Sequence, residues 1–114
     1  MSEAKRRVHV KLKYVPEYPD PIKVLAGQKV RVGGEDEEYP GWKWCKGPDG
    51  REGWVPAELL SEAKGEATVL EDYSAQELSV REGEEVEVED ARHGWLRVQN
   101  ANGDRGWIPA SHTT

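Results

Sequence analysis

Phenylalanine is absent from this 114-residue chain, which also has only one cysteine and one methionine. Five Trp and four Tyr therefore supply its aromatic surface, and an indole ring combines a large apolar area with one N–H donor. The lone Cys45 excludes a disulfide within the chain. No run approaches the ~18 apolar residues that cross a bilayer, and the start lacks the apolar core of a secretion signal. We therefore expect a cytoplasmic protein without a membrane partner.

Basic residues are scarce in the C-terminal half of the chain. Residues 1–62 carry 11 Lys/Arg and 11 Asp/Glu, whereas residues 63–114 carry 5 and 11, so the net charge of −6 falls in the second half. Proteins that bind nucleic acid normally need a basic patch, because neutralising phosphates drives most of their affinity. We interpret the Lys5-Arg6-Arg7 cluster as a solvated tail. Nucleic acid is therefore not an expected partner, and basic ligands suit the second half better.

The residue groupings that catalysis or metal binding requires are also missing. His9, His93 and His112 have neither metal-ligand spacing nor neighbouring Cys residues. Cys45 has no neighbouring His, so we interpret it as a buried or edge thiol rather than a nucleophile. The acidic run at residues 35–38 lacks the spacing of a calcium loop and is interpreted as a solvated face. The sequence predicts no enzymatic activity, no metal and no cofactor.

An internal repeat sets the expected architecture. Residues 41–57 recur at residues 94–110 without a gap, 53 positions later, and seven positions are identical. Two of these identities are Trp, a rare residue, which makes chance similarity a poor explanation. Residues 24–32 match residues 80–88 at an offset of 56, so the first copy has extra residues that we assign to loops. We expect two domains: residues 1–62 with longer loops, and residues 63–114, which are acidic.

Each copy has the pattern of short strands joined by turns. Residues 30–32 and 86–88 alternate apolar and polar side chains, as half-buried strands do. Residues 48–50 and 101–103 end in Gly and are typical of hairpin turns. Only residues 56–64 resemble a helix, and we expect them to form a short connection. The predicted fold is therefore all-β: two small β-barrels in tandem, joined by a short turn or helical linker.

The order of these landmarks resembles that of an SH3 domain. In the second copy the resemblance rests on residues 69–73, 77–80 and 83–84, on Gly94-Trp95, and on residues 106–110. It covers residues 67–112, and a looser match covers residues 8–60. The first copy is similar to the bacterial variant SH3 proteins, which occur as small tandem chains. We therefore expect two SH3-like barrels and a bacterial source.

The resemblance implies a groove that docks extended, proline-rich peptides between aromatic rings, with a loop acid that pairs with a basic residue of the ligand. The second copy departs from the family at Glu71 and His112, which replace groove tyrosines. Trp54 and Trp107 are expected to be partly exposed. The ligand-binding residues that the resemblance and the aromatic set of the first copy indicate are Tyr14, Trp44, Trp54, Pro56, Tyr73, Glu77, Trp95, Trp107 and Pro109.

Two points stay open from the sequence. Counting back from Gly106 places Trp95 second in the family's adjacent aromatic pair, whereas a changed hairpin length would make it the first, which faces the groove. Trp42 either packs the barrel or faces the groove with Trp44, which lies two residues further along the same strand.

Our leading hypothesis is a non-catalytic, monomeric interaction module that binds an extended peptide or protein segment, proline-rich or basic. The alternatives are binding to the cell wall or carbohydrate, and a structural role as an accessory subunit. The two copies are expected to do different jobs.

Overall fold

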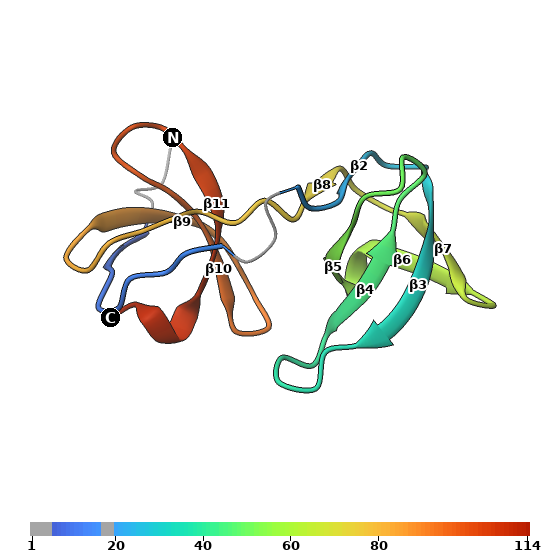
Figure 1. Ribbon diagram of the computed structural model, residues 1–114, viewed down its shortest axis with the longest axis horizontal. Coiled ribbons are helices and arrows are strands. Elements are labelled where there is room, and N and C mark those ends of the chain that lie inside the picture. The colour runs from blue at the N-terminus through green and yellow to red at the C-terminus, as the bar shows by residue number, and fades with distance from the viewer. Residues whose placement is uncertain (1–5, 17–19) are drawn as a thin grey trace. The chain divides into compact units, whose positions relative to one another are not determined.

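The architecture comes from a computed structural model, which describes residues 6–16 and 20–114. Within these residues the chain is all-β, with eleven strands and two single-turn 3₁₀-helices (Figure 1). The expectation of an all-β, SH3-like fold is confirmed, although the strand order leaves each sheet open rather than closed into a barrel. No helix among the described residues is long or apolar enough to cross a membrane.

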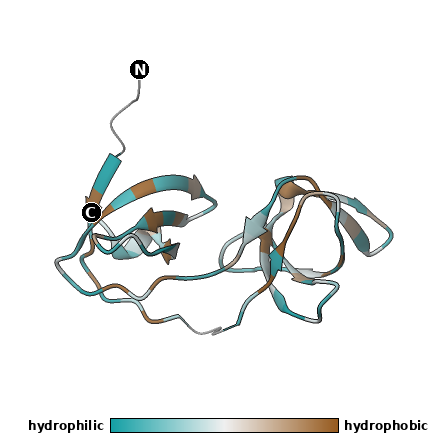
Figure 2. Cartoon of the chain, turned by 90° about the horizontal axis from the view of Figure 1, so that it is seen from above, coloured by the Kyte–Doolittle hydropathy of each residue, from teal (hydrophilic) through white to brown (hydrophobic). Residues whose placement is uncertain are grey.

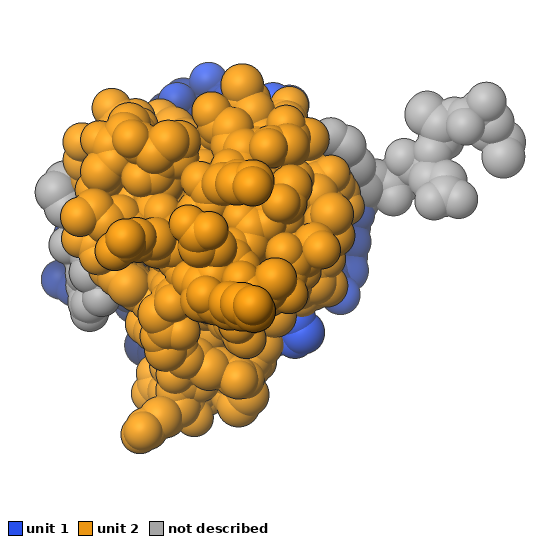
Figure 3. Space-filling model, turned by 90° about the vertical axis from the view of Figure 1, so that its right-hand side faces the viewer, with its two compact units in different colours: residues 1–17, 77–114 blue, residues 18–76 orange. Residues whose placement is uncertain are grey.

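The chain divides into two compact units, drawn in blue and orange in Figure 3. Unit 1 comprises residues 1–17 and 77–114, and unit 2 comprises residues 18–76. These units differ from the expected domains 1–62 and 63–114. The first segment of each sequence repeat joins the body of the other repeat, and we call these two segments exchanged. Unit 2 is therefore one continuous stretch of chain inserted into unit 1.

Unit 1 is built on a four-stranded antiparallel sheet in the order β1-β9-β10-β11. The N-terminal strand β1 pairs along β9, with Val8 opposite Val86, although 78 positions separate the two residues in sequence. The elements of unit 1 are β1 (Arg6–His9), β9 (Glu85–Arg92), β10 (Trp95–Gln99), β11 (Arg105–Pro109) and the 3₁₀-helix η2 (Ala110–His112).

Unit 2 contains a five-stranded sheet in the order β5-β4-β3-β7-β6 and a short pair of strands, β2 and β8. Strand β7, from the second sequence repeat, lies between β3 and β6 of the first, with Ala67 opposite Val30. The elements of unit 2 are β2 (Lys23–Val24), β3 (Lys29–Glu35), β4 (Trp42–Lys46), β5 (Glu52–Pro56), the 3₁₀-helix η1 (Ala57–Leu59), β6 (Leu60–Ala63), β7 (Glu66–Val69) and β8 (Tyr73–Ser74).

The connection between the repeats explains why β7 joins unit 2. Only Lys64 and Gly65 separate β6 from β7, and both have positive φ, 56° and 80°. Two consecutive residues in this region form the tight hairpin turn whose twist matches that of antiparallel strands. The segment expected as a linker is therefore a hairpin inside unit 2. Of the helix expected over residues 56–64, only the single turn η1 forms.

Each unit has its own apolar core, because hydrophobic and hydrophilic positions alternate along its strands (Figure 2). In unit 1, Val98 and Ile108 are fully buried, and Val8 and Val10 of the exchanged segment complete the core. In unit 2, Cys45 and Val55 are fully buried, and Ala67 and Val69 of β7 complete the core. The exchanged strands therefore contribute packing as well as hydrogen bonds.

The basic start of the chain is not a solvated tail. Arg6 and Arg7 lie in β1, and the guanidinium of Arg7 is 3.4 Å from a Glu85 carboxylate oxygen and 3.3 Å from one of Glu87. Lys5 lies outside the described residues. The interpretation of this cluster was wrong because its partners follow about 80 positions later in the sequence, and no local pattern indicates them.

Candidate functional site

Three rings and a carboxylate from distant parts of the sequence meet in unit 1. The ring of Tyr14 lies edge-on to Trp95, with centroids 5.8 Å apart, and edge-on to His112, at 5.6 Å. The Tyr14 hydroxyl donates a hydrogen bond to the Glu77 carboxylate. All four side chains are half-buried. We call these four residues the Tyr14 cluster.

Backbone contacts hold the Tyr14 cluster in place. Tyr14 and Val80 exchange two N–H···O hydrogen bonds, both of 3.0 Å, which fix the exchanged segment against the body of unit 1. Glu77 forms a parallel bridge with Trp107 of β11. A side chain at Gly106 would meet the backbone of Glu77 and Leu78 at 2.7–2.8 Å, so only Gly allows this approach. The ring and the carboxylate are thus positioned before any ligand binds.

The structure settles which face Trp95 occupies. Leu96 points into the core and is 4% exposed, so Trp95, its neighbour on β10, faces the opposite side, where Tyr14 lies. Trp95 therefore presents its ring on the side of β10 that faces away from the core, beside Tyr14. His112 was noted from the sequence only as a departure, but it still supplies an aromatic ring against Tyr14. No pattern in the sequence around His112 predicts its contact with Tyr14.

The corresponding surface of unit 2 is different. Tyr73, the counterpart of Tyr14, donates a 2.9 Å hydrogen bond to the Trp54 carbonyl. Pro21 occupies the position that matches Glu77, so unit 2 has no acid there. Trp44 and Trp54 form an edge-on pair with centroids 5.0 Å apart, and Trp44 donates its indole N–H to Glu52 at 2.9 Å. Both of these indoles are half-buried.

The expected site residues are therefore regrouped by the strand exchange. Tyr14 was expected to share a groove with the tryptophans of its own repeat, but it lies with Trp95 and Glu77 of the second. Tyr73 was expected with Glu77 and lies with Trp54 of the first repeat. Unit 1 holds Tyr14, Glu77, Trp95, Trp107 and Pro109; unit 2 holds Trp44, Trp54, Pro56 and Tyr73.

Some expected groove residues are buried. Trp107 is 4% exposed, contrary to the expected partial exposure, and the Glu77 segment lies against its strand. Pro56 and Pro109 are buried where their strands end opposite Trp42 and Trp95. Trp42 is also 4% exposed, so of the two positions left open only Trp95 presents a ring to the surface. Trp54 is partly exposed, as expected.

The exchange also moves the negative charge. Unit 1 has nine Lys/Arg and ten Asp/Glu, a formal charge of −1, whereas unit 2 has seven and twelve, a formal charge of −5. The acidic domain expected at residues 63–114 is therefore not one of the compact units. The acidic unit is unit 2, the one with the half-buried Trp44 and Trp54 pair.

Lys43 and Cys45 of β4 both have altered proton affinity. A 2.7 Å hydrogen bond to Glu62 raises the pKa of Lys43 above its usual value. Burial raises the pKa of the Cys45 thiol to about 11. Within the described part of the chain, no three His, Cys, Asp or Glu residues are gathered as a metal site would require.

Cys45 is expected to resist alkylation while the protein is folded. Its side chain is fully buried, and a thiol with a pKa of about 11 is almost entirely protonated at neutral pH. Iodoacetamide labelling followed by mass spectrometry should be at least about 100-fold slower in the native protein than in guanidinium chloride, because thiolate and access are both lacking. Equal rates in the two conditions would contradict the burial of this thiol.

Comparison with known proteins places the chain in a family. The variant SH3 domain model matches twice, at residues 7–63 and 68–113. Together these matches span most of the sequence, and the chain belongs to the variant SH3 domain family. SH3 domains are generally non-catalytic protein-interaction modules. A separate search against curated proteins found no match to the chain.

Proposed function

We propose that unit 1 binds an extended peptide segment across the Tyr14 cluster, with the rings of Tyr14 and Trp95 as the main contacts. The observation that carries the proposal is the contact of Tyr14 with Trp95, His112 and Glu77. A half-buried group of rings beside a carboxylate offers apolar contact and one anionic partner. A peptide that has proline beside a basic residue complements both features.

The rings and the carboxylate of the Tyr14 cluster favour an extended ligand that carries a positive charge. A polyproline II segment is already extended, so it loses little conformational entropy when its prolines pack against the rings. The Glu77 carboxylate accepts from the Tyr14 hydroxyl, and its negative charge complements an Arg or Lys of the ligand. Because His112 replaces the family's terminal tyrosine with a smaller ring, we expect modest affinity.

A titration followed by residue-resolved NMR tests the proposal. The probe is a proline-rich peptide with one Arg beside the prolines, and a second peptide replaces that Arg with Ala. The first peptide should shift the indole resonance of Trp95 and the resonances around Tyr14. Trp95→Ala should weaken binding by at least about tenfold, since losing a central ring costs about 1.4 kcal/mol or more.

Trp44→Ala is the matched control, because it removes a half-buried indole from unit 2 and leaves the Tyr14 cluster intact. It should bind the peptide as the unmodified chain does. If neither peptide shifts a resonance near Trp95, or if Trp44→Ala and Trp95→Ala weaken binding equally, the Tyr14 cluster is not the peptide site.

One observation favours a second candidate, the accessory subunit. The Trp44 and Trp54 pair lies on the outward side of β4 and β5 in the unit with the larger negative charge. Aromatic residues with part of their ring at the surface are enriched in protein interfaces, whose rims are polar. Co-purification of a stable partner that is lost on Trp44→Ala would support this role. Sedimentation with peptidoglycan separates it from binding to the cell wall.

The remaining expectations stand as proposals on the same footing. We propose a cytoplasmic, monomeric, bacterial protein that binds neither nucleic acid nor membranes and has no catalytic activity. Fractionation of the source cell, light scattering, and binding assays with nucleic acid and with lipid vesicles test these points one by one.

A further inference from the structure

We infer that charges on the first strand of each repeat select the exchanged arrangement over a self-closed one. These charges lie opposite charged residues of the neighbouring strand. In the self-closed arrangement, each first strand would stay with its own repeat: β1 would pair with β3, and β7 with β9. Both arrangements would bury the same apolar residues, because Val8 and Ala67 occupy equivalent places. The charged neighbours of these two residues differ.

The equivalence follows from the strand register. Val8 lies opposite Val86 in unit 1, and Ala67 lies opposite Val30 in unit 2. Val30 and Val86 are themselves matched residues of the sequence repeat. One position before the apolar residue, Arg7 lies opposite Glu87 and Glu66 lies opposite Arg31. The two arrangements can therefore be compared pair by pair.

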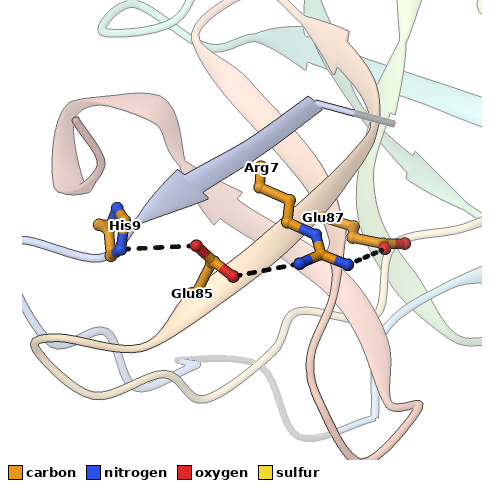
Figure 4. Close-up of polar contacts among 4 residues, drawn as sticks. All are labelled: Arg7, His9, Glu85 and Glu87. Atoms are coloured by element: carbon orange, nitrogen blue, oxygen red, sulfur yellow. Dashed lines mark hydrogen bonds and ion pairs between the residues drawn. The ribbon is translucent and has the colours of Figure 1, made fainter. Parts of the chain in front are cut away.

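In unit 1 the exchanged strand brings positive charge to a negative strand. The Arg7 guanidinium spans Glu85 and Glu87, at 3.4 Å and 3.3 Å, and the Nε2 atom of His9 lies 3.6 Å from Glu85 (Figure 4). Opposite charges facing each other across an antiparallel pair stabilise it, and like charges destabilise it. This network therefore favours β1 on β9.

In unit 2 the signs are reversed, and the pairing is again complementary. Glu66 of β7 lies opposite Arg31 of β3, and the uncharged Thr68 lies opposite Lys29. The basic strand β3 thus receives the acidic strand β7, while the acidic strand β9 receives the basic strand β1.

Self-closure would place like charges opposite each other in both units. Arg7 would lie opposite Arg31 in one unit, and Glu66 would lie opposite Glu87 in the other. Two arrangements that bury the same apolar residues are discriminated by such repulsive pairs in the wrong one. The short Lys64-Gly65 turn acts in the same direction, because it keeps β7 beside β6.

The test separates the charges from the turn. Insertion of about six Gly/Ser residues between Lys64 and Gly65 frees the first strand of the second repeat to reach either unit. In this background, the charges are either left native or exchanged by R7E/E66R, which leaves the net charge unchanged. Cross-strand NOEs report the arrangement: Val8 to Val86 and Ala67 to Val30 if exchanged, Val8 to Val30 and Ala67 to Val86 if self-closed.

With native charges, the exchanged NOE pairs should dominate. R7E/E66R should shift the ratio of exchanged to self-closed chains by about tenfold or more toward self-closure, and high salt should reduce the shift. The matched control is R81E/E82R, which exchanges two charges in the turn before β9 and should leave the ratio unchanged. A ratio that is the same in R7E/E66R and in this control overturns the inference.

A further variant covers the case in which R7E/E66R does not fold. R7E/R31E/E66R/E87R restores opposite charges at both registers of the exchanged arrangement. It should fold and give the exchanged NOE pairs. If this chain also fails to fold, or gives the self-closed pairs, the charges do not select the arrangement.

Discussion

Residues 20–76, expressed alone, are expected to fold cooperatively, whereas residues 20–65 are expected to remain unfolded. The longer fragment contains all the described strands and the core of unit 2 as one continuous chain. The shorter one lacks β7 and β8. Circular dichroism during denaturant titration should show a single transition for the first fragment and none for the second.

The size of this effect follows from the place of β7 in the sheet. Strand β7 lies between β3 and β6, so its removal leaves β6 without a neighbour and exposes a new edge on β3. It also removes Ala67 and Val69, which are 3% and 1% exposed. Losing two buried side chains and two ladders costs more than the ~3–5 kcal/mol that so small a domain has available. Equal stability of the two fragments would contradict the assignment of β7 to unit 2.

Gly106→Ala is expected to destabilise unit 1 by about 2–3 kcal/mol and to leave unit 2 unchanged. A Cβ atom at this position would lie 2.7 Å from the Glu77 carbonyl carbon and 2.8 Å from the Leu78 nitrogen. Both are backbone atoms, so no side-chain rotation relieves the contact. The Glu77 segment must move away from β11, and its carboxylate then moves away from Tyr14.

Native-state hydrogen exchange resolves the two units. Amides of Val98 and Ile108 should lose protection in Gly106→Ala, while those of Cys45 and Val55 should not. Gly34→Ala is the control, because its new Cβ would meet nothing within 4 Å and its φ is not in the left-handed region. Gly53→Ala should act more weakly in unit 2, where the nearest atom is a side-chain methyl of Ile22 at 2.9 Å. Protection in Gly106→Ala equal to that in Gly34→Ala would show that the close approach is not required.

Local chemistry made most of the fold predictable. The turns at residues 48–50 and 101–103 form as expected, and the Gly residue that ends each has a φ of 88°. The alternation at Val30 and Val86 likewise places these residues in the cores. Each of these signals depends on neighbours within a few positions, which a sequence displays directly.

The exchange of first strands was not predicted, because the first strands of the two repeats have the same apolar pattern. Val8 and Ala67 are both apolar, so the apolar pattern does not distinguish the two arrangements. The distinguishing features are the two-residue turn at Lys64-Gly65 and the charges of Arg7 and Glu66, whose meaning depends on strands far away in sequence.

In the candidate site, too, individual residues were predictable from the sequence and contacts between distant residues were not. Tyr14, Glu77 and Trp95 were each expected to bind a ligand, but their association in one cluster was not, since it requires the exchange. Pro56, Pro109 and Trp107 were expected in a groove and are buried, because a landmark in the sequence does not reveal which face of its strand is covered.

The most direct test of the Tyr14 cluster is an NOE between the ring protons of Tyr14 and the indole protons of Trp95 in the unmodified chain. The two residues are 81 positions apart, one in each sequence repeat, and their ring centroids are 5.8 Å apart. We predict a clear cross-peak between these rings, and a second one from Tyr14 to His112. If cross-peaks from Tyr14 to Trp42 replace those to Trp95 and His112, each repeat closes on itself. That result would contradict the Tyr14 cluster.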